Sequence, residues 1–160
     1  MSNVSKDFYF GYRASSWGWG VWKDRWNPID WEIKDYNEFI KDKKAVKDFR
    51  RGGSDMPRML HKQMQGKIDS WAIRFCYHQF KNDLLTVFPT ISKLESIGFS
   101  KEATHTSGTE RFITPIDVEL KREFLFESFI DVDNNLANEF ASFFSLKNRV
   151  FNQIRQRLKF

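Results

Sequence analysis

The sequence has almost no cysteine and few histidines. Cys76 is the only cysteine among the 160 residues, and there are three histidines. A single cysteine cannot form an internal disulfide, and it cannot build a zinc site from several thiolates. These absences exclude a disulfide-stabilised secreted scaffold, and we expect a reducing, cytoplasmic compartment.

Long apolar runs are also absent. No window approaches the roughly 20 apolar residues that a helix needs to span a bilayer. The N-terminus, MSNVSKDFYF, lacks the basic stretch followed by an apolar one that marks a secretory signal. We therefore expect a chain that is soluble or peripheral to the inner face of a membrane.

Aromatic residues, by contrast, are abundant. They make up 17% of the chain, with 17 Phe and 6 Trp, which predicts either a very aromatic core or a site lined by rings. Residues 8–31 hold five of the six tryptophans beside repeated glycines. This pattern is typical of backbone bent around large rings, and it is too irregular for one long strand.

Apolar spacing along the rest of the chain predicts a helix-rich α/β fold with a few short strands, in a single domain over residues 1–160. Helices are expected at 19–26, 32–51, 56–65 and 69–80, a strand at 84–89, a loop at 97–108, a short strand or apolar run at 124–129, and amphipathic helices at 133–160. On the helix over 69–80 the expected shared face consists of Trp71, Ala72, Phe75, Cys76 and Phe80.

Asp69, in the stretch GKIDSWAIRF, has two compatible interpretations. It stands where a helix N-cap is expected, and a cap needs only a short side chain that accepts a hydrogen bond. A carboxylate held at the positive end of a helix, beside Ser70 and Trp71, can also accept a proton from a bound hydroxyl.

The charge balance favours anionic partners. The net charge is +5 and the pI is about 9.3, which suits nucleotide phosphates, nucleic acid or an anionic membrane. The polar face of the last predicted helix is a solvated face or a surface that lies on a membrane. Its basic residues are Lys147, Arg149, Arg155, Arg157 and Lys159. Nucleic acid is disfavoured, because the tryptophans that could stack on bases lie at the other end of the chain.

Candidate metal ligands are sparse. His105 lies among small residues in ATHTSG, and one loop histidine is by itself a solvent-exposed residue rather than a metal site. The Asp131-Val132-Asp133 pattern occurs in DVDNNL, whose Asp and Asn density is typical of a turn and a helix cap.

Three segments together resemble a known family. SSWGWGVWKDRW, then GKIDSWAIRF followed by FKNDLLTVFPTISKLESIGF, then ATHT follow the order and approximate spacing of the C-terminal half of bacterial family 2-type glycosyltransferases, found in polysaccharide-synthesis loci. The resemblance covers about residues 8–108. It implies the acceptor half of a GT-A fold, a partial domain in which the N-terminal, Rossmann-like nucleotide-binding half is lacking.

The resemblance also implies roles for individual residues. Asp69 would be the general base that deprotonates an acceptor hydroxyl as it attacks the anomeric carbon of a nucleotide sugar in an inverting displacement. His105 would stand at the late position that contacts a divalent metal, Mn or Mg, or the diphosphate. The residues expected to bind substrates are Trp17, Gly18, Trp19, Ser70, Trp71 and Arg74.

The resemblance leaves the donor-binding strands and an early D-x-D without counterparts in this chain. We therefore expect a glycosyltransferase-like unit that turns over little by itself, whose partners are a nucleotide sugar, a glycan acceptor and a separate N-terminal half or a second copy. Two alternatives from other classes stay open: a non-catalytic module that binds sugars or a partner chain, and a basic nucleic-acid-binding domain.

Overall fold

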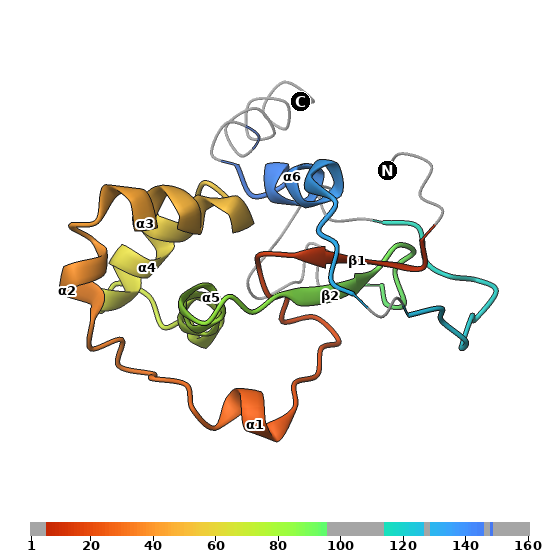
Figure 1. Ribbon diagram of the computed structural model, residues 1–160, viewed down its shortest axis with the longest axis horizontal. Coiled ribbons are helices and arrows are strands. Elements are labelled where there is room, and N and C mark those ends of the chain that lie inside the picture. The colour runs from red at the N-terminus through yellow and green to blue at the C-terminus, as the bar shows by residue number, and fades with distance from the viewer. Residues whose placement is uncertain (1–5, 96–113, 127–128, 146–147, 149–160) are drawn as a thin grey trace, which may run out of the picture.

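The structure is a computed structural model that describes residues 6–95, 114–126 and 129–145, together with Asn148 (Figure 1). Within these residues the fold is helix-rich α/β, with six α-helices and one two-stranded antiparallel sheet. The coarse fold class expected from the sequence is therefore confirmed. In chain order the elements are β1 (Phe8–Gly11), α1 (Lys23–Trp26), α2 (Tyr36–Phe39), α3 (Lys43–Phe49), the 3-10 turn η1 (Arg50–Gly52), α4 (Met56–Met64), α5 (Trp71–Lys81), β2 (Thr86–Pro89) and α6 (Asn134–Ser142).

The sheet joins two distant parts of the chain. β1 pairs with β2 in a register that runs from Phe8 opposite Pro89 to Gly11 opposite Thr86. The strand expected at 84–89 is confirmed as β2, whereas β1 lies in a region that the sequence pattern did not predict as a strand. A four-residue strand carries too little alternation to be recognised alone, and it forms here because a partner strand pairs with it.

One face of the sheet is covered by α6, which lies beside it in Figure 1. The rings of Tyr9 and Phe88 stack across the two strands with centroids 5.4 Å apart, and Phe140 of α6 lies 4.7 Å from Phe88. This packing confirms the first part of the amphipathic helices expected at 133–160. The remainder, apart from residues 143–145 and Asn148, lies outside the described residues, as does the loop expected at 97–108.

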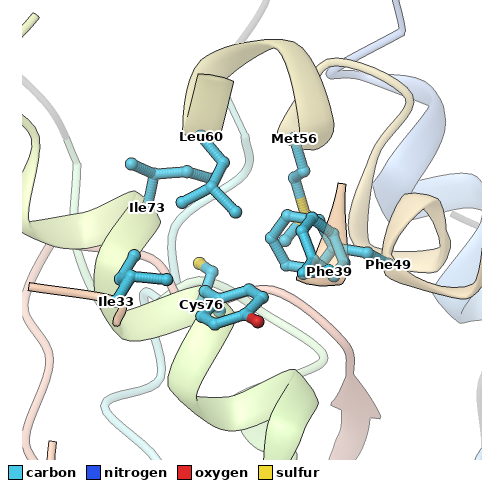
Figure 2. Close-up of a cluster of buried hydrophobic side chains, with 8 residues drawn as sticks. Ile33, Phe39, Phe49, Met56, Leu60, Ile73 and Cys76 are labelled. Atoms are coloured by element: carbon cyan, nitrogen blue, oxygen red, sulfur yellow. The ribbon is translucent and has the colours of Figure 1, made fainter. Parts of the chain in front are cut away.

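The main core lies between α3, α4 and α5 (Figure 2). Its members are Ile33, Phe39, Phe49, Met56, Leu60, Ile73, Cys76 and Tyr77. Helix α4 confirms the predicted 56–65 helix, since Met56 and Leu60 are fully buried one turn apart. Burial of this much apolar surface is the main source of the fold's stability.

Helix α5 buries a different face from the one predicted. Ile73, Cys76 and Tyr77 enter the core, while Phe75 is buried against tryptophan rings and Trp71 remains 36% exposed. The helix lies between the core and these rings, so apolar residues occupy two sides of it. The prediction that Trp71 shares one face of the helix with Cys76 was therefore wrong.

Two other predicted helices differ from the structure. The helix expected at 19–26 is a single turn, α1, and the one expected at 32–51 is divided into α2, α3 and η1. The division follows from Asp42, whose carboxylate accepts hydrogen bonds from the backbone N–H groups of Lys44 and Ala45 and so starts a new helix. At 124–129 two alternatives were open, a short strand and an apolar run; the described residues, 124–126 and 129, form no strand.

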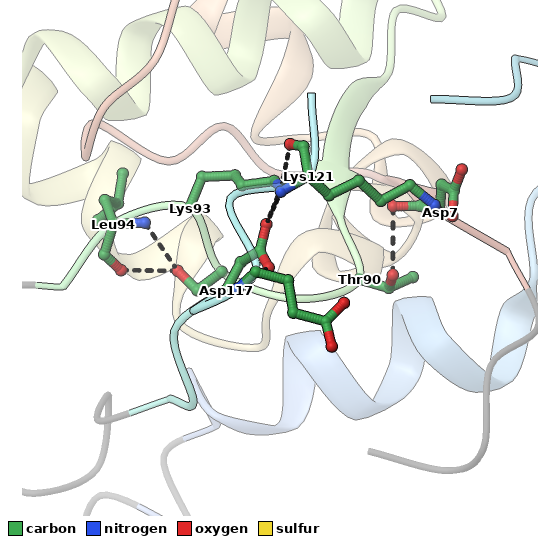
Figure 3. A network of polar contacts seen from close by, with 8 residues as sticks. Asp7, Thr90, Lys93, Leu94, Asp117 and Lys121 are labelled. Carbon is green, nitrogen blue, oxygen red and sulfur yellow. Dashed lines mark hydrogen bonds and ion pairs between the residues drawn. The ribbon is translucent and has the colours of Figure 1, made fainter. Parts of the chain in front are cut away.

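Residues 114–126 are held to the start of the sheet by a polar network (Figure 3). The ammonium group of Lys93 forms an ion pair with Asp117, and that of Lys121 lies 2.6 Å from Asp7. Asp7 also accepts a hydrogen bond from the backbone N–H of Leu125 at 3.1 Å. Asp117 likewise accepts a hydrogen bond from the backbone N–H of Lys121 at 2.9 Å. Each of the two carboxylates therefore holds a backbone N–H group as well as a lysine side chain.

Candidate functional site

The turn between α4 and α5 places Asp69. Gly66 follows the C-cap residue of α4, Gln65, and its φ of +65° allows the backbone N–H of Lys67 to donate to Lys62 O at 2.9 Å. This six-to-one bond is the Schellman arrangement that glycine favours at a helix C-terminus. The N–H of Ser70 then donates to Gln63 Oε1 at 2.6 Å, which ties the end of the turn back to α4.

Ser70, and not Asp69, is the N-cap of α5. The Ser70 hydroxyl accepts a hydrogen bond from the Ile73 N–H at 3.4 Å, and its backbone is extended as a cap requires. The cap interpretation of Asp69 is therefore wrong by one residue. The physical reason is that serine caps a helix as well as aspartate does, and Ser70 stands at the position where the helix begins.

Released from capping, the Asp69 carboxylate points to solvent. Its side chain is 95% exposed, and Oδ1 lies 3.1 Å from Nη2 of Arg74, one turn further along α5. Its other oxygen, Oδ2, accepts no hydrogen bond within the described part of the chain. One oxygen is thus anchored while the other is open to a ligand.

Arg74 links Asp69 to the tryptophans. Its Nη1 donates to the backbone oxygen of Trp31 at 3.4 Å, and its guanidinium lies 5.9 Å from the centroid of the Trp31 ring. The resemblance implies that Arg74 is either a structural partner or a partner on the phosphate side. Its contacts with a carboxylate and a carbonyl are of the structural kind, and the role on the phosphate side stays a prediction. An exposed ion pair contributes little to stability, so its effect is mainly to orient Asp69.

Five rings gather beside this ion pair from two stretches of the chain, 19–31 and 71–75. We call them the tryptophan cluster: Trp19, Trp26, Trp31, Trp71 and Phe75. Trp19 and Trp71 stack with centroids 4.8 Å apart and an interplanar angle of 24°, and Trp26 and Trp31 also lie 4.8 Å apart. Trp19 and Trp71 keep 37% and 36% of their surface exposed, so the cluster presents rings to solvent.

Trp17 and Gly18 lie just before Trp19 on the same loop. Trp17 is 41% exposed, and Gly18 has a φ of +51°. A Cβ atom on Gly18 would lie 2.2 Å from Cδ2 of Leu94, so this position is restricted both by its conformation and by the packing of Leu94. Gly18 therefore packs against Leu94. Its expected role in binding substrate stays a prediction.

The structure offers no ready metal site in the region it describes. Among residues 6–95, 114–126 and 129–145, no three His, Cys, Asp or Glu side chains come together to hold an ion. His105 lies outside the described residues. Asp133 caps α6 by accepting hydrogen bonds from Asn135 and Leu136, and Asp131 pairs with Lys6, so the turn-and-cap interpretation of DVDNNL is confirmed.

A pocket lies elsewhere, and none of the candidate site residues lines it. It is bounded by Tyr12, Asp48, Phe49, Arg51, Gln79, Phe80, Asp83, Leu84, Leu85 and Val132. With Asp69 95% exposed and Trp19 and Trp71 each more than a third exposed, the candidate site is an exposed ring surface with a carboxylate at its edge.

Sequence reasoning missed a buried ion pair between Arg13 and Asp55. Nη1 of Arg13 lies 2.7 Å from Oδ1 of Asp55, and the guanidinium lies 3.9 Å from the centroid of the Phe144 ring. A Cβ atom on Gly53 would lie 2.7 Å from the same Asp55 oxygen, so the glycine makes room for the pair. Consecutive glycines such as Gly52 and Gly53 are typical of a loop, but nothing in this stretch of the sequence indicates a partner forty residues upstream.

Comparison of the chain with models of known protein families, with curated proteins and with solved structures finds no match. Within the described residues, no helix has both the length and the apolar character needed to cross a bilayer.

Proposed function

We propose that this chain is the acceptor-binding, base-carrying part of a sugar transferase. One observation carries the proposal: Asp69 stands directly before Ser70 and Trp71, and Trp71 stacks on Trp19 from a segment far away in the sequence. Exposed aromatic rings bind the apolar faces of sugars, and a carboxylate at their edge can reach a sugar hydroxyl. The resemblance of the same segments to the acceptor half of family 2-type glycosyltransferases supports the same role.

In the proposed reaction, an acceptor glycan lies against Trp19 and Trp71. Oδ2 of Asp69 accepts the proton of the acceptor hydroxyl while that oxygen attacks the anomeric carbon of the donor sugar. The bond between the anomeric carbon and the nucleotide diphosphate breaks as the new glycosidic bond forms, which inverts the configuration. Arg74 holds Oδ1, so the basic oxygen keeps its direction.

The resemblance further implies a divalent cation, Mn or Mg, that would bind the diphosphate of the donor. The described residues contain no set of ligands for such an ion, and His105 lies outside them. No step of the proposed mechanism therefore passes through a metal. The nucleotide-sugar donor and the half of the enzyme that would bind it are also implied only by the resemblance, and both belong to the proposal.

A binding experiment tests the role of Asp69. Oligosaccharides and their monodeoxy analogues are titrated against the protein and its Asp69→Asn variant by ligand-observed NMR. If Asp69 contacts the reacting hydroxyl, Asp69→Asn weakens binding of the parent glycan. The same substitution should not weaken binding of the one analogue that lacks that hydroxyl. The coupling free energy between the protein substitution and the removal of the hydroxyl then identifies the contact. Equal effects of Asp69→Asn on every analogue would count against the role as base.

A second candidate function is that of a non-catalytic module that binds a partner chain. The observation that favours it is a run of exposed apolar side chains beyond the sheet. They include Val118 (82% exposed), Leu120 (70%), Leu125 (85%), Phe126 (72%), Phe129 (64%) and Ile130 (71%). Exposed apolar surface of this kind often marks an interaction site. Light scattering tests it, because a strictly monomeric protein at all concentrations would argue against self-association through these residues.

A further inference from the structure

A strongly basic surface lies on α3 and η1, away from the candidate site. Residues 41–51 carry six Lys or Arg and two Asp, in a chain whose net charge is +5. We call five of these side chains the basic face: Lys43, Lys44, Lys47, Arg50 and Arg51. All five are exposed.

The five basic residues follow one side of the helix. They stand at positions i, i+1, i+4, i+7 and i+8, which bring them to one face at about 3.6 residues per turn. Ala45, Val46 and Phe49 occupy the opposite side and pack against the core. The orientation of the basic face toward solvent is therefore fixed by burial of the other side of the same helix.

Most of this charge is not neutralised by the protein. Lys44 pairs with Asp48 at 2.8 Å, and Arg51 lies over the ring of Tyr12. Lys43, Lys47 and Arg50 form no ion pair with any residue in the described part of the chain. Three adjacent cations on a rigid surface produce a local positive potential that attracts an extended anion.

The surroundings of the basic face favour a lipid surface over nucleic acid. A single-stranded nucleic acid uses exposed rings as stacking platforms. The exposed Trp17, Trp19 and Trp22 lie in the segment that leads into α1, which is well apart from α3 in Figure 1, and the exposed Trp71 begins α5. Among the exposed large apolar side chains of the described residues, the one closest in sequence to the basic face is aliphatic: Ile40 is 39% exposed. An aliphatic side chain beside lysines suits the boundary between headgroups and acyl chains.

We propose that the basic face docks the protein on a membrane by binding anionic phospholipid headgroups. This surface differs from the C-terminal helix expected to contact a membrane from the sequence, which lies outside the described residues. It is also independent of the proposed sugar site, so either can fail without the other.

Vesicle co-sedimentation of the full chain tests this proposal. The probes are phosphatidylcholine vesicles with and without phosphatidylglycerol, at one fixed ionic strength. We expect binding only when phosphatidylglycerol is present. The triple variant Lys43→Glu, Lys47→Glu, Arg50→Glu should lower the partition coefficient roughly tenfold or more, because each basic residue near an anionic surface contributes strongly.

A charge-matched control separates a specific surface from net charge. The variant Lys34→Glu, Lys67→Glu, Arg122→Glu makes the same change in charge at exposed positions outside α3. It should retain most of the binding, and circular dichroism should show both variants folded. An equal loss in the control, or no preference of the wild type for phosphatidylglycerol, would overturn the proposal. So would tighter binding to duplex or single-stranded RNA than to these vesicles at the same salt, which would assign the surface to nucleic acid.

Discussion

Arg13 and Asp55 form an ion pair inside the protein, with 2.7 Å between Nη1 and Oδ1, and their side chains are 11% and 4% exposed. The pair joins the end of β1 to the start of α4, and the Phe144 ring covers the guanidinium. A buried charge pair is expensive to break because either partner alone remains desolvated and unpaired.

We predict that Asp55→Ala lowers the free energy of unfolding by about 3–5 kcal/mol, since it leaves the Arg13 guanidinium buried without its carboxylate. Urea denaturation followed by circular dichroism measures the change. The control is Lys44→Ala, which breaks the solvent-exposed pair with Asp48 and should change the free energy of unfolding far less than Asp55→Ala does. Similar losses in the two variants would contradict the importance of burial.

Gly53→Ala should disturb the same pair from the backbone side. The φ of Gly53 is +144°, and an added Cβ would approach both Asp55 Oδ1 and Arg13 Nη1 within 3 Å, at 2.7 and 2.8 Å. We expect a loss of at least about 1 kcal/mol in unfolding free energy. Gly20→Ala is the control, because a Cβ at Gly20 meets no atom within 4 Å. A neutral Gly53→Ala would show that the glycine is not needed there.

The helix cap of α5 gives a test at the candidate site itself. Ser70→Ala removes the hydroxyl that accepts from Ile73 N–H and should cost about 1 kcal/mol. Asp69→Ala removes only an exposed ion pair and should cost about 0.5 kcal/mol or less. Chemical denaturation of the two variants side by side decides between the residues, and the reverse order of losses would restore Asp69 as the cap.

Local apolar patterning was enough to predict α4, α5 and β2. Met56 and Leu60 lie one turn apart, and both enter the core, as periodicity requires. β1 was missed because its formation depends on pairing with β2, almost eighty residues further along the chain. Pairing over that distance leaves no mark in a four-residue segment.

The sequence also indicated part of the candidate site. The order of the segments placed Asp69 near tryptophans, and the stacking of Trp71 on Trp19 brings them together. The exact cap was not predictable, because Asp69 and Ser70 are equally good capping residues and stand side by side. The Arg13–Asp55 pair was not predictable at all, since neither residue type indicates its own burial.

The network in Figure 3 predicts a pH dependence of stability. The ion pair with Lys121 lowers the pKa of Asp7, and the ion pair with Lys93 lowers the pKa of Asp117, each below the ordinary 3.8. A carboxylate with a lowered pKa stabilises the folded state fully above its unfolded pKa. That contribution is lost as the pH falls below 3.8 and through the folded pKa.

The variant Lys121→Gln measures how much the Lys121–Asp7 ion pair contributes to this pH dependence of stability. The variant should be less stable than the wild type at neutral pH, and the difference should shrink as the pH is lowered from 7 to below 3.8. Denaturation curves at several pH values measure the difference, with Lys34→Gln as a control whose effect should stay small throughout. A difference that is independent of pH would show that the Lys121–Asp7 pair does not contribute through charge.

The last prediction concerns the rings of the tryptophan cluster. Trp71 stacks on Trp19 and is partly exposed, whereas Trp22 is 77% exposed and stands beyond the stacked pair. If the cluster binds glycans, Trp71→Ala should weaken glycan binding at least about tenfold, or about 1.4 kcal/mol, while Trp71→Phe retains a ring and loses less. Trp22→Ala should bind as the wild type does.

Ligand-observed NMR with the same oligosaccharides measures all three variants, and thermal unfolding shows whether each is folded. Trp71→Ala also removes packing against Phe75, so a loss of binding by this variant alone does not establish a ring contact with sugar. A glycan affinity that falls from the wild type to Trp71→Phe and again to Trp71→Ala establishes the ring contact, provided that the two variants unfold at similar temperatures. Equal losses in Trp22→Ala and Trp71→Ala would instead indicate that any exposed ring serves, and would remove the stacked pair from the proposed site.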